Sequence, residues 1–249
     1  LTDVTGVQTC ALPICERPIP PEPEPFDPLP SRSPGMWPEG EKRYVLPPGD
    51  RGFLVDDPGT SYDITAHVAN LAAQTGWPDP DDLRLWLARE FFPLHLKMYS
   101  KSRRKAPIYW QLATPSASYS VWLYAHNVTS DTFFMLQSDV VGPKLAHGVQ
   151  RLTSLQQSAG ASPSAQARRE IAAQEAFVEE LRAFLGEIKR VAPLWNPDLD
   201  DGIVLVTVPL WRLFPQHKPW QNELKTRWDE LTAGKYDWAH LAMHLWPER

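Results

Sequence analysis

Cysteine is almost absent from this chain, and several other features are missing with it. Only two of the 249 residues are cysteines, Cys10 and Cys15. No apolar run reaches the roughly 18 residues of a membrane-crossing helix, and no succession of charged, apolar and small residues marks a secretory leader. The net charge of −5 excludes a globally basic surface of the kind that binds nucleic acid. We therefore expect a cytoplasmic protein with no membrane partner, in which contact with an anionic partner requires a local patch.

The first 15 residues resemble something other than a protein. Residues 4–14 resemble the translation of a common short-read sequencing adapter, and the natural reading frame is expected to begin near Glu16. We treat residues 1–15 as an adapter-derived artefact and draw no disulfide, metal or redox inference from the two cysteines within them. A fragment truncated at its 5′ end is the corresponding expectation, which agrees with a chain that begins at Leu1.

Composition divides the rest of the chain into four segments. Proline is frequent in residues 16–50, and this frequency predicts an extended Pro-rich linker. Residues 51–130 are predicted to form an α+β subdomain with a β-hairpin, and residues 131–192 a helical hairpin. Residues 193–249 are predicted to form a C-terminal strand–helix–helix segment.

Helix and strand patterns alternate within residues 51–130. An apolar stripe predicts a first helix through Ile64, Val68 and Leu71. A second helix is marked by Pro80 at its first position, and Pro93 is expected to bend or end it. Residues 107–112 and 119–124 are rich in strand formers and are separated by turn-forming residues, which predicts the β-hairpin.

The pattern is helical from residue 131 to residue 191, with interruptions expected at Gly142-Pro143 and at residues 158–163. Apolar residues at seam positions of the second arm have a partner stripe in the first: Ile171, Val178, Leu181, Leu185 and Ile188 against Leu145, Val149 and Leu152. An antiparallel helical hairpin is the simplest product, because a short loop joins neighbouring helices. A partner-binding coiled coil is the alternative, but the internal hairpin buries the same stripes and is favoured.

The C-terminal segment is rich in tryptophan. Residues 202–208 are a continuous apolar run, which predicts a buried strand. The next helix has an apolar side formed by Trp220, Leu224, Trp228 and Leu231, with Trp228 as a candidate core anchor, and a further helix is expected from Asp237. The predicted fold class is α+β and helix-rich, with a β-hairpin and short strands, a long antiparallel helical hairpin and a Trp-rich C-terminal helical segment.

Five basic residues lie within nine positions without an acid, and aromatic residues are interleaved with them. Phosphate contacts from such a run give salt-sensitive affinity that depends little on nucleotide sequence, while the rings either pack in the core or support a flipped nucleotide. The candidate DNA-contact residues are Lys97, Lys101, Arg103, Arg104, Lys105 and Tyr109. The alternative is a solvated basic loop ahead of a core strand.

Two further motifs have a chemical interpretation and a simpler one. His240 and His244 have the spacing of two metal ligands on a helix, but no third ligand is evident, so packed or capping histidines are favoured. Asp198 with Glu223 and Lys225 imitates the carboxylate and lysine pattern of restriction nucleases. The Glu-x-Lys pair is predicted to lie on a helix, whereas in those nucleases it lies on a strand. The cluster of Asp198, Asp200 and Asp201 is therefore better interpreted as a polar turn before a buried strand.

Phe91-Phe92, His95 and residues 99–110 resemble a segment of PglX-type adenine-specific DNA methyltransferases of BREX phage-defence systems. Further segments resemble the C-terminal region of that family, in the same order along the chain: residues 23–30, 123–126, 198–202, 209–214, 236–241 and 246–249. The resemblance covers nearly everything after the adapter, and the joint order is more specific than any one motif.

The resemblance implies a parent enzyme of a restriction-modification or phage-defence system. That enzyme transfers a methyl group from S-adenosylmethionine to an adenine flipped out of the duplex. The family's catalytic Asn-Pro-Pro-aromatic motif is missing here, because the nearest string, residues 196–199, lacks the second proline and the ring. No glycine-rich turn for the cofactor is found either. We therefore expect no catalytic, cofactor-binding or metal residue in this chain, and a methyltransferase domain missing from its N-terminal side.

The main hypothesis is a C-terminal, non-catalytic fragment that helps an adenine methyltransferase to recognise and position DNA. Its implied partners are double-stranded DNA, the missing methyltransferase domain and other subunits of the defence system. The rival hypothesis is a protein–protein interaction scaffold that docks other defence subunits through the Trp-rich terminus and the helical pair. In that case the chain does not touch DNA.

Overall fold

The computed structural model describes residues 51–58, 60, 62–72, 80–101 and 104–248. The chain divides into two compact units, Leu1–Pro47 and Pro48–Arg249, and every described residue belongs to the second. The predicted adapter segment and Pro-rich linker lie outside the described residues. None of the helices in the described ranges combines the length and apolar character that a membrane crossing requires.

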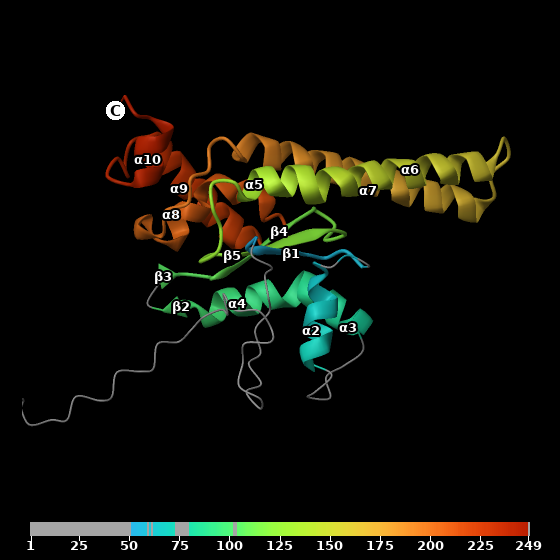
Figure 1. The fold of residues 1–249 in the computed structure, drawn as a ribbon, viewed down its shortest axis with the longest axis horizontal. Coiled ribbons are helices and arrows are strands. Elements are labelled where there is room, and N and C mark those ends of the chain that lie inside the picture. The colour runs from blue at the N-terminus through green and yellow to red at the C-terminus, as the bar shows by residue number, and fades with distance from the viewer. Residues whose placement is uncertain (1–50, 59, 61, 73–79, 102–103, 249) are drawn as a thin grey trace, which may run out of the picture. The chain divides into compact units, whose positions relative to one another are not determined.

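A three-stranded antiparallel sheet lies at the centre of the second unit. Its strands are β1 (Phe53–Val55), β4 (Tyr109–Ala113) and β5 (Ser120–Tyr124), in the order β1-β5-β4. The predicted β-hairpin is confirmed, with Tyr109 opposite Tyr124 and Ala113 opposite Ser120. All five residues of β5 are buried, because helices cover both faces of the sheet. Helix α4 (Phe92–Met98) lies on one side, and the pair α6 (Gly142–Ala159) and α7 (Ala165–Val191) lies on the other (Figure 1).

Two long helical stretches cover this sheet, and each passes a proline. The first consists of α2 (Ile64–Ala72), α3 (Pro80–Trp86), the π-helix Leu87–Phe91 and α4 (Phe92–Met98). The second consists of α5 (Thr132–Met135), the π-helix Leu136–Val141, α6 (Gly142–Ala159) and α7 (Ala165–Val191). Pro80 begins α3, as the sequence predicts.

The helical stretches continue past both prolines. The sequence predicts a bend or an end at Pro93 and an interruption at Gly142-Pro143, but neither position ends its helix. A proline inside a helix has no N–H to donate, and its ring clashes with the carbonyl four residues earlier. In both stretches a π-helical segment ends two residues before the proline. The wider π turn relieves the clash, so each helix continues past its proline.

Helices α6 and α7 form the predicted antiparallel hairpin, which extends beyond the sheet (Figure 1). A β-carbon at Gly148 of α6 would lie 3.4 Å from Val178 of α7, so the absence of a side chain allows the helices to approach closely. The buried amide of Gln174 donates a hydrogen bond of 2.9 Å to the Gly148 carbonyl. This hydrogen bond links α6 and α7 within their apolar interface.

The C-terminal segment is helical throughout, so the strand predicted over residues 202–208 is wrong. The structure has a short turn (Leu199–Asp201), α8 (Ile203–Thr207), a 3₁₀ segment (Val208–Leu213), α9 (Lys218–Thr232) and α10 (His240–Leu245). A short run in which nearly every residue is apolar has no periodicity that separates strand from helix. The run becomes helical because Asp198 caps the preceding turn and Gly202, at a φ of 86°, redirects the chain into α8.

The segments share one aromatic core. Trp195 lies between Trp110 of the sheet (6.3 Å between ring centroids) and Phe133 of α5 (4.7 Å), and its indole N–H donates to the Val206 carbonyl at 2.7 Å. The core anchor on α9 is Trp220, which is fully buried, whereas Trp228 is only partly buried. The role predicted for Trp228 therefore belongs to Trp220, which lies about two turns earlier on the same helix.

Candidate nucleic-acid interface

The predicted basic run forms a small hairpin directly after α4. Strands β2 (Ser100–Lys101) and β3 (Arg104–Lys105) are antiparallel, with Lys101 opposite Arg104. We call residues 97–105 the basic hairpin. It lies at the end of α4, far from the tip of the α6–α7 pair (Figure 1). Lys97 is exposed in the last turn of α4, where a cation is favoured by the negative end of the helix dipole.

The backbone at the start of the basic hairpin is held to the end of α4. The Ser100 hydroxyl donates to the Leu96 carbonyl at 2.5 Å. The Ala106 N–H donates to the Tyr99 carbonyl at 3.1 Å, which closes the hairpin from the other side. Arg103 and the side chains of Lys101 and Arg104 lie outside the described residues. For Lys101 and Arg104 the structure describes the backbone alone, in strands β2 and β3.

Lys105 differs from the other candidates because it is engaged within the protein. Its ammonium forms an ion pair with Glu223 of α9 and lies 5.8 Å from the centre of the Trp220 ring. Both partners are partly buried, with 29% and 27% of their side chains exposed. The prediction that Lys105 is a DNA contact is therefore a poor fit to the structure, in which this residue ties the hairpin to α9.

Tyr109 belongs to an aromatic cluster behind the hairpin, defined by Phe91, His95, Tyr99, Tyr109 and Tyr124. Ring centroids are 4.5 Å apart for His95 and Tyr99, 5.5 Å for His95 and Tyr109, and 5.1 Å for Tyr109 and Tyr124. Burial raises the pKa of Tyr109 to about 12, so its phenol stays neutral. Tyr99 is 41% exposed and presents this cluster to solvent next to the basic residues.

His95 is the residue of this region whose role the sequence did not reveal. It is buried, and its Nε2 accepts hydrogen bonds from the backbone N–H groups of Ile108 and Tyr109, both at 3.1 Å. Burial lowers the pKa of His95 to about 4, so the ring is neutral with its proton on Nδ1. His95 thus fixes the beginning of β4 against α4. Its position four residues before Tyr99, on the buried face of α4, was the available signal.

The two other motifs have structural roles in the described residues. Nδ1 of His240 lies 3.0 Å from Asp198 and 3.2 Å from Asp201, and His244 is exposed. No group of three or more His, Cys, Asp or Glu side chains in the described part of the chain is arranged to hold a metal ion. Glu223 is on helix α9 and pairs with Lys105. The nuclease interpretation requires the Glu-x-Lys pair on a strand, so this arrangement disfavours it.

The described residues contain no counterpart of the S-adenosylmethionine site that the resemblance implies for the parent enzyme. The sheet of the described residues is antiparallel and lacks the glycine-rich turn from a parallel strand into a helix that binds such a cofactor. We therefore derive no chemical step through it.

Comparison with known proteins adds no family to this picture. No protein-family model matches the chain, and a search of curated proteins found no significant match. The function has to be argued from the residues themselves.

Proposed function

We propose that this chain is a non-catalytic module that helps an adenine-specific DNA methyltransferase of a restriction-modification or phage-defence system to recognise and position double-stranded DNA. In this proposal the methyltransferase part, which binds S-adenosylmethionine, is supplied from outside the chain. The module acts in the cytoplasm together with other subunits of the defence system.

The observation that carries the proposal is the neighbourhood of the basic hairpin and the aromatic cluster. Residues 97–105 contain five bases and no acid in a chain whose net charge is −5. Even without Lys105, the sequence of this segment contains four cations, enough for several phosphate contacts. Such contacts set the position of a protein on the duplex and carry little sequence information.

Salt dependence of binding tests the proposal directly. The triple substitution Lys97→Gln, Lys101→Gln and Arg104→Gln removes three cations from the hairpin and leaves the Lys105–Glu223 pair intact. Binding of the chain to a fluorescent 30-base-pair duplex is measured over a series of salt concentrations. Each lost phosphate contact should reduce the slope of log affinity against log salt by about one, with preference between sequences unchanged.

The matched control neutralises Arg168, Arg169 and Lys189, three exposed cations of α7 far along the chain. It changes the net charge equally and should leave the slope within error of the parent. If the hairpin variant keeps its melting temperature and also keeps the slope of the parent, this edge does not contact DNA.

A protein-docking scaffold is the second candidate. It is favoured by two large apolar side chains near the C-terminus, Trp238 and Met243, which are more than half exposed. For a pure scaffold, both triple variants leave DNA affinity and its salt slope unchanged.

A further inference from the structure

The C-terminal segment contains a cavity of about 550 Å³, a size typical of sites that receive a ligand or a side-chain cluster. We call it the C-terminal pocket. It is formed by the end of α9, the following turn, α10 and the residues after α10. Its lining consists of Leu231, Gly234, Asp237, Ala242, Met243, Trp246 and Pro247.

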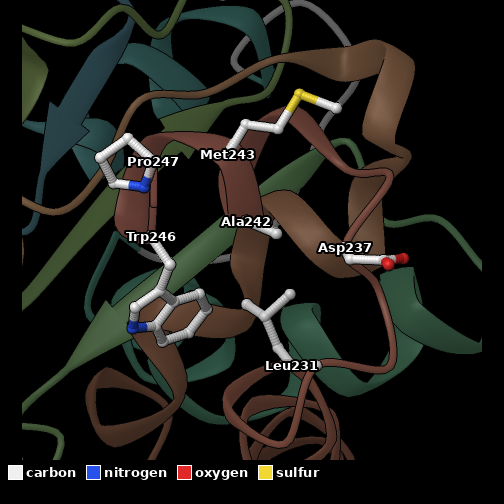
Figure 2. A pocket seen from close by; sticks show the side chains of 7 residues that line it. Leu231, Asp237, Ala242, Met243, Trp246 and Pro247 are labelled. Carbon is white, nitrogen blue, oxygen red and sulfur yellow. The ribbon is translucent and has the colours of Figure 1, made fainter. Parts of the chain in front are cut away.

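The floor of the C-terminal pocket is apolar. Leu231 and Ala242 are almost completely buried, with 1% and 6% of their surface exposed. The side chains of Leu231 and Trp246 turn toward each other beneath Ala242 (Figure 2). An apolar group placed between them would lose contact with water on several sides, which is the main favourable contribution to binding at such a site.

The pocket is pre-formed, because hydrogen bonds hold the elements on either side. The Asp201 carboxylate accepts the backbone N–H groups of His240 and Leu241 at 2.8 Å each, which anchors the start of α10. Glu230 accepts bonds from Tyr236 and Arg227, both at 2.8 Å, and from Lys235 at 3.0 Å. An occupant therefore finds the site ordered before it arrives, so little ordering entropy opposes its binding.

The margin of the pocket carries one carboxylate. Asp237 is the ionisable residue of the lining, its side chain points outward at the margin, and it forms no ion pair with the described residues (Figure 2). The neighbouring acids Asp229 and Glu230 already have cationic partners, Lys225 for the first and Arg227 and Lys235 for the second. A phosphate is repelled here, and one carboxylate does not suffice for a metal ion. The complementary group is an organic cation.

The exposed apolar residues point to a protein partner. Trp238 is 58% exposed and Met243 is 54% exposed, and tryptophan and methionine are enriched at protein interfaces. A small ligand inside the cavity would leave Trp238, which does not belong to the lining, in water. From these observations we infer that the C-terminal pocket docks a segment of a partner protein. That segment places a large apolar side chain between Leu231 and Trp246 and a neighbouring Lys or Arg against Asp237. The inference does not depend on DNA contact by the basic hairpin.

The test starts from a library of random 12-residue peptides displayed on phage and selected on the immobilised full chain. Peptides that also bind the variant Ala242→Phe, whose ring fills the pocket, are discarded. The remaining peptides should share a large apolar residue within a few positions of Lys or Arg. One of them, synthesised and measured by calorimetry, should bind the variant Asp237→Lys about tenfold more weakly than the parent.

A charge exchange provides the decisive control. Replacing the basic residue of the peptide by Glu should weaken binding to the parent and restore binding to Asp237→Lys. The matched variant Asp131→Lys reverses an exposed aspartate at the start of α5 and should change the affinity less than twofold. If Ala242→Phe does not fold, Met243→Ala serves as the filter, because Met243 is exposed. Selected peptides without the apolar–basic pair, or an affinity insensitive to both Asp237 and Met243, would overturn the inference.

Discussion

The basic hairpin and the C-terminal pocket are opposite in character, although both are attached to helix α9. Glu223 of α9 holds Lys105 of the hairpin, and Leu231, about two turns further along, forms the floor of the pocket. One region presents cations beside aromatic rings, and the other presents an aspartate beside apolar side chains. The net charge of −5 averages over both and describes neither. Partners of this chain therefore have to be inferred from local patches.

The two regions also share a structural device. In each, one buried side chain accepts two consecutive backbone N–H groups from an element distant in sequence. His95 does this for Ile108 and Tyr109 as a neutral ring, and Asp201 does it for His240 and Leu241 as a carboxylate. Each region can therefore be loosened separately, and the substitutions below should distinguish them.

The largest effect is expected for Trp220→Ala, which removes a fully buried ring beneath the basic hairpin. Trp220 is fully buried, packs edge-on against Phe214 at 6.4 Å and lies under Lys105. Its loss should lower the free energy of unfolding by about 3–5 kcal/mol. Denaturant unfolding measures this. The control is Trp228→Ala on the same helix, where the ring is only partly buried and the loss should be about 1–2 kcal/mol. Equal losses would show that the burial of the two rings has been assigned wrongly.

Asp201→Ala should affect the pocket and spare the hairpin. The carboxylate satisfies two N–H groups at the start of α10, so its removal should cost about 2–3 kcal/mol. Amide hydrogen exchange should accelerate at His240 and Leu241 and remain slow at Ile108 and Tyr109. Asp201→Asn retains one acceptor oxygen and should lose about half as much. Equal exchange rates in the parent and the alanine variant would contradict the anchoring role.

The smallest effect concerns pH and should appear on the hairpin side. The pKa of His95 is lowered from 6.5 to about 4 in the folded chain. The unfolded chain therefore takes up the proton first as the pH falls. The stabilisation by His95 is complete above about pH 6.5 and is lost as the pH falls to about 4.

Urea unfolding at a series of pH values measures this loss, with His95→Gln as the comparison, because it keeps a hydrogen-bond acceptor but does not titrate. His217 also has a pKa lowered by burial, so only the difference between parent and variant reports on His95. A difference that stays constant between pH 7 and pH 4 would contradict the role of His95.

The candidate interface was only partly predictable. A cluster of bases with no acid is visible in the sequence, and the exposure of Lys97 agrees with it. The engagement of Lys105 was not predictable, because Glu223 lies 118 residues away along the chain. His95 is an ordinary histidine of an amphipathic helix until β4 is placed beside it. The C-terminal pocket has no sequence signature, since its lining residues lie at five places between residues 231 and 247 without a regular spacing.

Local periodicity in the sequence determined the β-hairpin of β4 and β5, the start of α3 at Pro80 and the α6–α7 pair, because each depends on residues close together in the chain. Tertiary structure decided the rest. Residues 202–208 are helical, because a continuous apolar run has no period in the sequence, and each helix continues past its proline after a π-helical segment. Trp220 is the core anchor where the sequence predicted Trp228, and Lys105 pairs with Glu223 within the protein. Burial and ion pairing depend on which distant elements pack together, so local sequence patterns do not reveal them.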